Sequence, residues 1–312
     1  ILCRRESIPH RHSFVGRFGA SSQKLNAKGP PAGQPLLKGR DGMGYNRLMS
    51  ILLAMLLGLV QGLCEFLPVS SSGHLVLLQN IFGVEEGALF FDTMLHVGTL
   101  FAVFAVYWRS IWEMLRHPLQ KKVGMLLLAT ALTAALAVLC RDLISEAYGG
   151  AFLGLGFVAT ACILYLSERA LGIRAKTSHG IEEMTPKSAL GIGLMQGVAI
   201  LPGISRSGST IAGARFFGLD KGAAAEFSFL LSIPAILGSV VLQVPDLLEA
   251  GMGSLSWGPL LAGMAVAAGS GYLAIRWMLR LIKTKSLLGF SIYTGTLGVL
   301  VLFDQLVTHV FF

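Results

Sequence analysis

Long apolar stretches separated by short polar segments make up most of the chain. A helix needs about 20 apolar residues to cross a bilayer core about 30 Å thick. Because a continuous helix satisfies its own backbone hydrogen bonds in lipid, the pattern predicts an all-α polytopic membrane protein with six transmembrane helices. The predicted spans are residues 90–108, 123–140, 150–167, 224–244, 259–280 and 286–308.

Two further apolar segments, about residues 48–80 and 188–218, are interrupted midway. Pro68 divides the first segment, and Pro202-Gly203 divides the second. Each half is too short to cross the hydrocarbon core, and proline stops a helix. Non-helical backbone at that depth is tolerated only where protein or a water-filled cavity surrounds it. We therefore expect two re-entrant helix–loop–helix hairpins.

The two interrupted segments resemble each other. Residues 61–73 read QGLCEFLPVSSSG and residues 196–208 read QGVAILPGISRSG. Gln-Gly opens both, Leu-Pro lies midway with a slip of one position, and Ser-x-Ser-Gly closes both. An acidic residue follows each segment about 18 positions later, Asp92 in the first and Glu226 in the second. The chain therefore contains an internal repeat.

Basic residues in the loops predict the orientation of the chain. One set of loops holds Arg109, Arg116, Lys121, Lys122, Arg169, Arg174, Lys176, Lys187, Arg276, Arg280, Lys283 and Lys285. The alternate loops, residues 141–149 and 245–258, hold a single basic residue, Arg141. The positive-inside rule places the basic loops in the cytoplasm. The first hairpin then enters from outside and the second from the cytoplasm, which makes the repeat an inverted one whose broken helices meet near the midplane.

Composition agrees with a membrane protein. Hydrophobic residues make up 54% of the 312 residues and charged residues 13%, with a mean hydropathy of +0.67. Soluble domains carry about 25% charged residues. The four cysteines show no spacing that indicates a disulfide framework or a zinc site.

The net charge of +8 is concentrated at the N-terminus. Residues 1–47 hold nine Lys or Arg and two acidic residues, which accounts for +7. The basic character therefore does not indicate a nucleic-acid partner. We interpret residues 1–47 as a disordered basic leader outside the mature protein, and residues 48–312 as the membrane domain. An Arg-rich targeting peptide is the alternative, and Met43 or Met49 is an alternative start.

Ionisable groups at membrane depth are functional candidates by default. Gln61 and Glu65 lie four residues apart, on one face of a helix. A carboxylate binds a divalent cation or accepts a proton. The stretch SSSGH (residues 70–74) adds three hydroxyls and an imidazole, and SRSGST (residues 205–210) adds a guanidinium whose fork fits a phosphate. Together these groups resemble a phosphoryl-transfer site.

Each of these residues also has a structural interpretation. A Ser-rich stretch in a membrane helix commonly serves packing, His74 alone fits a hydrogen-bonded structural residue, and Glu65 could pair with Arg206 for stability. Their convergence in two related hairpins favours the functional interpretation. Glu226 is a further candidate because it takes the second acid position of the repeat. His96 and Asp92 could line the cavity, but His96 has no partner motif.

The same residues resemble a known family. The sequence is similar to the bacterial undecaprenyl-diphosphate phosphatases of the bacitracin-resistance family, over about residues 48–312. The family motif (E/Q)xxxE followed by FLPVSS(S/T)GH is matched by Gln61–His74, and PGxSRSxxT is matched by Pro202–Thr210. EFSFLL and IP within residues 226–234 match as well. One position is weaker, because many members have Glu where this chain has Gln61.

The resemblance implies an inner-membrane hydrolase that converts undecaprenyl diphosphate to undecaprenyl phosphate, recycling the lipid carrier for peptidoglycan and conferring bacitracin resistance. It implies a polyprenyl diphosphate substrate, surrounding membrane lipid, a divalent cation such as Mg²⁺ or Ca²⁺, and an active site facing the periplasm. The oligomeric state stays open, with a homodimer as one alternative.

The family's functional residues have counterparts at matching positions of this chain, and the resemblance implies a role for each. The catalytic residues are Glu65, Ser71, His74 and Arg206; the phosphate-binding residues are Ser70, Ser72, Ser205, Ser207 and Thr210; the metal ligands are Gln61 and Glu65. Ser71 would attack the terminal phosphorus, or a water would attack directly.

The sequence leaves two alternatives to the diphosphatase to consider. An inverted repeat also suits a transporter that flips the lipid monophosphate. The type-2 phosphatidic-acid phosphatases are set aside, because the SGSTIAGARFF stretch after Arg206 contains no His.

Overall fold

The computed structural model describes residues 42–84, 88–147, 150–174, 178–250 and 257–312. Its elements are α1 (Gly42–Phe66), α2 (Ser71–Phe82), α3 (Ala88–Arg116), α4 (Lys121–Leu139), α5 (Arg141–Ala147), α6 (Leu153–Arg174), η1 (Ile181–Glu183), α7 (Pro186–Val198), α8 (Arg206–Phe216), α9 (Lys221–Ala250), α10 (Trp257–Thr284), α11 (Leu288–Phe303) and η3 (Asp304–Thr308). The predicted leader lies outside these residues except for its last six. Those six belong to α1, and the boundary at residue 48 stays a prediction.

The described part of the chain is helical, with a single isolated β-bridge between His179 and Leu219. Five helices are long and apolar enough to cross a membrane: α3, α4, α9, α10 and α11, the last with η3. The third predicted span is also a helix, α6, with 22 residues. The prediction of an all-α polytopic membrane protein is therefore confirmed.

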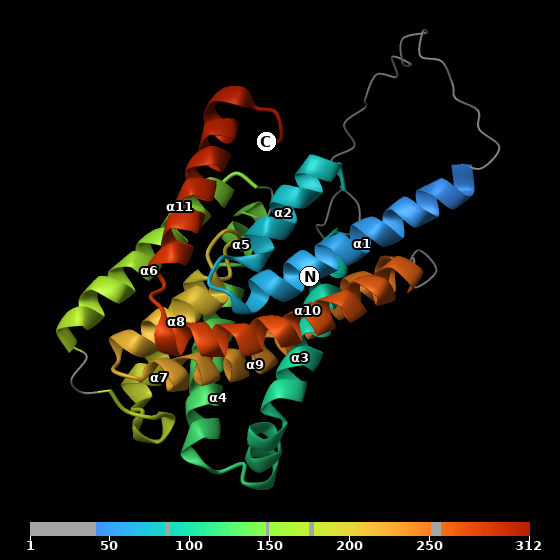
Figure 1. Cartoon of the computed structure of the whole chain (residues 1–312). Coiled ribbons are helices and arrows are strands. Elements are labelled where there is room, and N and C mark those ends of the chain that lie inside the picture. The colour runs from blue at the N-terminus through green and yellow to red at the C-terminus, as the bar shows by residue number, and fades with distance from the viewer. Residues whose placement is uncertain (1–41, 85–87, 148–149, 175–177, 251–256) are drawn as a thin grey trace, which may run out of the picture. The chain divides into compact units, whose positions relative to one another are not determined.

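Both interrupted segments are helix–loop–helix units. The first breaks between α1 and α2 at Pro68, and the second breaks between α7 and α8 at Pro202-Gly203. Gly203 adopts a left-handed backbone with φ 86°, a conformation that glycine reaches without a steric cost. In Figure 1, α2 folds back beside the end of α1, and α8 lies beside α7.

Close helix packing repeats between the two halves of the membrane domain. Gly58 of α1 lies against the backbone of Gly263 in α10, and Gly193 of α7 lies against the backbone of Ala129 in α4. Gly58 and Gly193 each stand three residues before the Gln-Gly pair of their repeat. The repeat therefore extends further towards the N-terminus than Gln61 and Gln196, and it includes the small residues that allow close helix contact.

Other contacts between helices follow the same correspondence. If α1, α2, α3, α4 and α6 correspond to α7, α8, α9, α10 and α11, then α3 contacts its counterpart α9, and α6 contacts its counterpart α11. The contact of α3 with α10 likewise has a counterpart in the contact of α9 with α4. This pattern is the one expected when two copies of one unit pack around a pseudo-two-fold axis.

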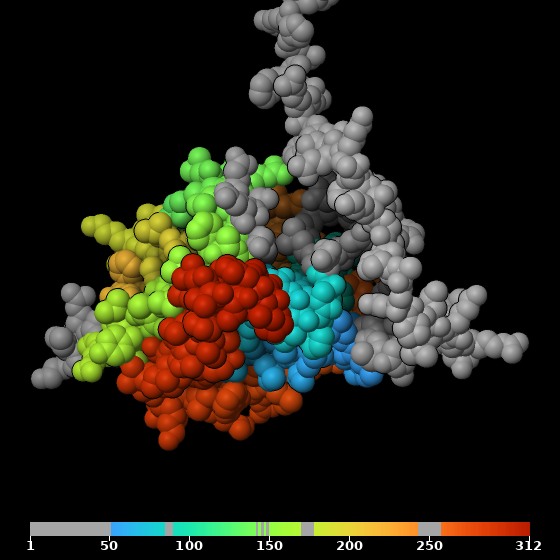
Figure 2. Space-filling model, turned by 90° about the horizontal axis from the view of Figure 1, so that it is seen from above, coloured from blue at the N-terminus to red at the C-terminus, as the bar shows by residue number. Residues whose placement is uncertain are grey.

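The largest cluster of buried apolar residues lies where the two units meet. Phe66 at the end of α1 packs edge-to-face against Phe229 of α9, with ring centroids 5.4 Å apart. A second cluster joins α2, α6 and α11 through Val76, Phe157 and Val301. Viewed as in Figure 2, the C-terminal part of the chain lies between α6 and α2. These clusters hold α2 and α8, the two short helices that carry the candidate residues.

Candidate active site

Both hydroxyl-rich loops end in a capped helix N-terminus. Ser70 caps α2 and accepts a hydrogen bond from the Gly73 N–H at 3.3 Å, while Ser205 caps α8 and accepts one from the Gly208 N–H at 3.1 Å. Ser71 and Arg206 are then the first residues of their helices. A helix N-terminus presents free N–H groups and a positive dipole end, which is a favourable place for a phosphate.

The two loops are in direct contact. The Ser207 hydroxyl donates to the carbonyl oxygen of Leu67 at 3.0 Å. A side-chain carbon placed on Gly208 would stand 3.2 Å from the ring of Pro68, so the chain segments are closely packed there. The N-termini of α2 and α8 therefore lie close together although they are far apart in the sequence.

Glu65 is the centre of the polar contacts at this place. Its carboxylate, 5% exposed, forms an ion pair with Arg206 through Oε1. Its Oε2 atom accepts hydrogen bonds from the Ser71 hydroxyl at 2.5 Å and from the Gln61 amide at 3.0 Å. A buried charge is costly unless it is paired and hydrogen-bonded. Here both oxygens of Glu65 have partners, and the predicted union of Glu65, Ser71 and Arg206 is observed.

Arg206 is held on its other side by α9. Its Nη1 atom donates to the carbonyl oxygen of Ser228 at 3.3 Å. Thr210, one turn further along α8, is fully buried and shares a hydrogen bond with the Ser228 hydroxyl at 2.6 Å. Its hydroxyl also reaches the carbonyl oxygen of Arg206 at 2.8 Å. Thr210 therefore braces the start of α8 in this structure.

The remaining predicted phosphate-binding hydroxyls lie at the two helix starts. Ser72 is half-buried, and its oxygen is 3.5 Å from that of Ser70. The oxygens of Ser205 and Ser207 are 3.4 Å apart. The Ser205 N–H donates to the Thr160 hydroxyl of α6 at 2.8 Å, which fixes the second loop on the body of the protein.

His74, near the start of α2, has hydrogen-bond partners other than Glu65. Its Nδ1 atom is 2.7 Å from the carbonyl oxygen of Ser70, and its Nε2 atom is 2.7 Å from the hydroxyl of Tyr293 in α11. The imidazole stacks on the Tyr293 ring and meets the edge of Phe157. The sequence prediction placed His74 at the site and did not include Tyr293.

A second imidazole approaches Glu65. The Nε2 atom of His96 in α3 is 3.4 Å from Glu65 Oε2, and its Nδ1 atom is 2.7 Å from the carbonyl oxygen of Asp92. The Asp92 carboxylate accepts a hydrogen bond from Gln79 of α2 at 2.7 Å. The sequence prediction did not include His96 among the site residues, because no motif surrounds it, although it lies one helical turn after the acid of the first repeat unit.

Glu226 occupies the corresponding acid position in α9 but has different partners. Among the described residues it forms an ion pair with Lys122 of α4, and Lys122 also donates to the Ser110 hydroxyl at 2.8 Å. Within the described part of the chain, Glu226 forms no hydrogen bond or ion pair with Arg206 or Ser71. The structure therefore brings Glu226 into a separate polar cluster that links α3, α4 and α9.

One buried oxygen of the site has no hydrogen-bond partner in the described part of the chain. Gln61 is fully buried, its amide nitrogen donates to Glu65, and its Oε1 atom has no hydrogen-bond partner in the described structure. An amide oxygen beside a carboxylate is a donor set that Mg²⁺ and Ca²⁺ accept. Mg²⁺ commonly uses one or two carboxylates together with substrate phosphates and water. Gln61 and Glu65 therefore fit a divalent cation that completes its shell with such ligands.

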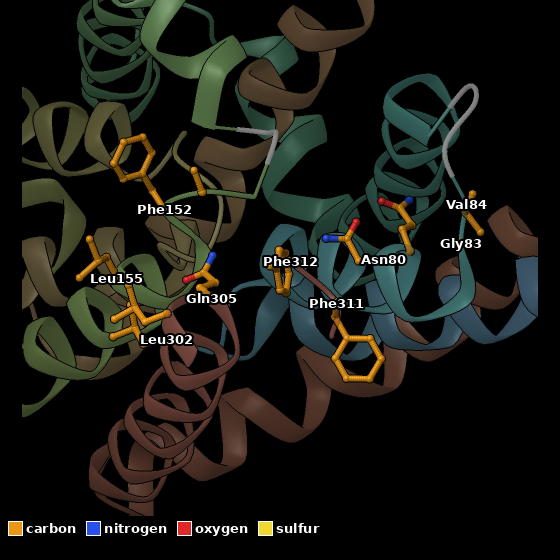
Figure 3. A pocket seen from close by; sticks show the side chains of 12 residues that line it. Asn80, Gly83, Val84, Phe152, Leu155, Leu302, Gln305, Phe311 and Phe312 are labelled. Carbon is orange, nitrogen blue, oxygen red and sulfur yellow. The ribbon is translucent and has the colours of Figure 1, made fainter. Parts of the chain in front are cut away.

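A cavity of about 740 Å³ lies at the opposite end of α2 from Ser71. Figure 3 shows Asn80 of α2, Phe152 directly before α6 and Gln305 of η3 on its walls. Asn80 is nine residues after Ser71, or about 13 Å along a helix axis. This cavity is therefore distinct from the place where Glu65, Ser71 and Arg206 meet.

Comparison with known proteins identifies the family of the chain. The sequence profile of the family described as Bacitracin resistance protein BacA matches residues 54–300, which include both hairpins. The chain belongs to this family. An undecaprenyl-diphosphatase of Carboxydothermus hydrogenoformans is 42% identical over 260 residues, covering 82% of this chain and 98% of that protein.

Two other relatives show the same coverage. The undecaprenyl-diphosphatase 4 of Bacillus thuringiensis is 40% identical over 264 residues, covering 84% of this chain and all of that protein. An undecaprenyl-diphosphatase of Methanosphaera stadtmanae is 37% identical over 276 residues, covering 81% of this chain and 97% of that protein. Membership of the family thus extends over the membrane domain.

Proposed function

We propose that this protein is a membrane-embedded phosphatase that converts undecaprenyl diphosphate to undecaprenyl phosphate and inorganic phosphate. The observation that carries the proposal is the set of contacts around Glu65, where Ser71, Arg206 and two helix N-termini converge. The names of the relatives in the bacitracin resistance family support the same substrate. Release of the carrier monophosphate supports peptidoglycan synthesis and bacitracin resistance.

Glu65 activates Ser71 in the proposed reaction. The Ser71 hydroxyl already donates to Glu65 Oε2 at 2.5 Å, so the carboxylate can accept the proton as the oxygen attacks the terminal phosphorus. The bond between that phosphorus and the bridging oxygen breaks, and undecaprenyl phosphate leaves. Water then cleaves the phosphoserine, and Glu65 returns the proton to Ser71. Direct attack by water, with Ser71 as a ligand, gives the same products.

Arg206 binds the phosphoryl group that is transferred. Its guanidinium stands at the N-terminus of α8 and contacts Glu65, so it can hold phosphate oxygens while the negative charge on them moves. Ser70, Ser72, Ser205 and Ser207 line the two helix starts and bind further phosphate oxygens. Thr210 supports this set by bracing Arg206 and Ser228.

His74 donates a proton to the lipid phosphate that leaves. Its Nε2 atom is the nitrogen that can exchange a proton, since Nδ1 faces the carbonyl oxygen of Ser70. A bound divalent cation would supply additional neutralisation of the diphosphate charge. Gln61 and Glu65 are the residues that would hold it.

The protein's surroundings follow from the charge pattern of its loops. We place it in the bacterial inner membrane with six transmembrane helices and two re-entrant hairpins, and with the basic loops in the cytoplasm. The matching contacts of Gly58 and Gly193 support an inverted repeat. The active site then faces the periplasm, surrounded by membrane lipid, and a homodimer is compatible with this arrangement.

Phosphate release in detergent tests the proposed function. Purified protein should release inorganic phosphate from undecaprenyl diphosphate without a second membrane leaflet, and the Arg206→Gln variant should not. The paired packing of the two repeat units also suits a flippase for the lipid monophosphate. Wild-type protein that is folded and binds the lipid but releases no phosphate would favour the flippase.

A further inference from the structure

The imidazole of His74 has hydrogen-bond partners at both ring nitrogens. The carbonyl oxygen of Ser70 lies 2.7 Å from Nδ1, and the hydroxyl of Tyr293 lies 2.7 Å from Nε2. Ser70 is the N-cap of α2 and has a φ of 68°, so its carbonyl belongs to a backbone turn that a serine rarely adopts. Tyr293 comes from α11, 219 residues away in the sequence.

The partner at Nδ1 determines the tautomer. A carbonyl oxygen can only accept, so Nδ1 must carry a proton. In the neutral imidazole Nε2 is then the acceptor, and the Tyr293 hydroxyl donates to it. A hydroxyl can also accept. The same hydroxyl can therefore remain bonded to Nε2 when His74 gains a proton.

Ring contacts fix the plane of the imidazole as well. The Tyr293 ring stacks on it with centroids 5.7 Å apart and planes 10° apart, and Phe157 meets it at 86° with centroids 5.3 Å apart. The position of α11 is itself held by Ser291, which donates to the carbonyl oxygen of Ala161 in α6 at 2.7 Å. Although 47% exposed, Tyr293 turns its hydroxyl inward, in keeping with the amphipathic character of tyrosine.

We propose that Tyr293 is a positioning residue of the active site, which holds the imidazole ring of His74 in place and keeps it in the Nδ1–H tautomer. This inference rests on the proposed phosphatase function and adds a residue from α11 to it. Tyr293 acts through His74 and not on the diphosphate itself. Neither hydroxyl-rich motif contains it, and its chain position gave no sign of the contact.

The test compares Tyr293→Phe, which keeps the stacked ring and removes the hydroxyl, with Tyr165→Phe. Tyr165 is also a half-exposed membrane tyrosine, but its hydroxyl contacts Arg169 on its own helix at 3.2 Å. Phosphate release from undecaprenyl diphosphate is measured for both variants, with kcat and KM determined separately. We expect Tyr293→Phe to lower kcat about 10- to 100-fold, as loss of an orienting partner does elsewhere. KM should change by less than about twofold.

A His74→Gln background separates positioning from general structural damage. If Tyr293 acts through His74, Tyr293→Phe should cause no further loss of kcat once His74 is replaced. An equal loss in both backgrounds, or a Tyr293→Phe enzyme as fast as Tyr165→Phe, would overturn the inference while leaving the phosphatase function intact. Absence of turnover in the folded wild-type protein would instead overturn the phosphatase function.

Discussion

Glu65, which is buried, and Arg206, which is half-buried, form an ion pair although 141 residues separate them in the chain. Glu65 is in the last turn of α1, and Arg206 is the first residue of α8. Breaking a buried pair by removing one partner commonly costs about 3–5 kcal/mol, because the other charge is left uncompensated. Neither hairpin alone contains both charges, so the site depends on the packing of one repeat unit against the other.

Ser71 is expected to form a covalent intermediate. In Ser71→Ala, kcat should fall about 100-fold or more, because the hydroxyl that donates to Glu65 is the attacking group. The matched control is Ser72→Ala, whose hydroxyl lies 3.5 Å from that of Ser70 and whose loss should cost tenfold at most. Phosphopeptide mass spectrometry after quenching with a slow substrate analogue should find phosphate on Ser71. Near-normal turnover of Ser71→Ala, with no phosphoserine in the wild type, would assign the attack to water.

His96 is expected to support the charge of Glu65. Replacing it by Leu removes the polar group 3.4 Å from Glu65 Oε2, and kcat/KM should fall about tenfold, the size of a lost hydrogen bond to a charged group. The His96→Gln variant can still donate a hydrogen bond to Glu65, so it should keep most of the wild-type activity. Steady-state phosphate release measures both variants, and equal activity in Leu and Gln variants would speak against the contact.

A second carboxylate at position 61 should strengthen cation binding. The Gln61→Glu variant places a charged oxygen where the amide oxygen now lacks a partner, so the Mg²⁺ concentration for half-maximal activity should fall about tenfold. Calorimetric titration of Mg²⁺ into the protein without substrate provides a second measurement. Unchanged Mg²⁺ dependence in both assays would remove Gln61 from the cation site.

Close contact between α7 and α4 should be sensitive to a single methyl group. A side-chain carbon on Gly193 would stand 2.5 Å from the carbonyl oxygen of Ala129, so Gly193→Ala should destabilise the protein by about 1–3 kcal/mol. Gly269→Ala in α10 is the control, because no atom lies within 4 Å of the added carbon. The midpoint of thermal unfolding should fall for the first variant and stay level or rise for the second. Equal midpoints would mean that the helices are not in close contact at Gly193.

Local chemistry predicted the helices and their interruptions. Apolar length is enough to indicate spans, and Pro68 and Pro202 are enough to indicate where two of the apolar segments stop being helical. The structure adds that two of the hydroxyls near these prolines, those of Ser70 and Ser205, are helix N-caps, a position that serine favours. These features depend on neighbours in the sequence, so a single chain reveals them.

The rest of the site depends on tertiary packing. His96 reaches Glu65 because α3 packs beside the first hairpin, and Tyr293 reaches His74 because α11 packs on α6. Neither residue has neighbours that form a motif. The small residues at Gly58 and Gly193 were present in the sequence, but their role appears only once the partner helices are known.

The most direct test of the whole account is a double-mutant cycle between Glu65 and Arg206. Phosphate release from undecaprenyl diphosphate is measured for wild type, Glu65→Gln, Arg206→Gln and the double variant. If the two hairpins form one catalytic site, each single change should lower kcat/KM at least about 100-fold, and the double change should be no worse than the more severe single one. Losses that multiply in the double variant, or a single variant with near wild-type activity, would contradict the claim that these two residues work together.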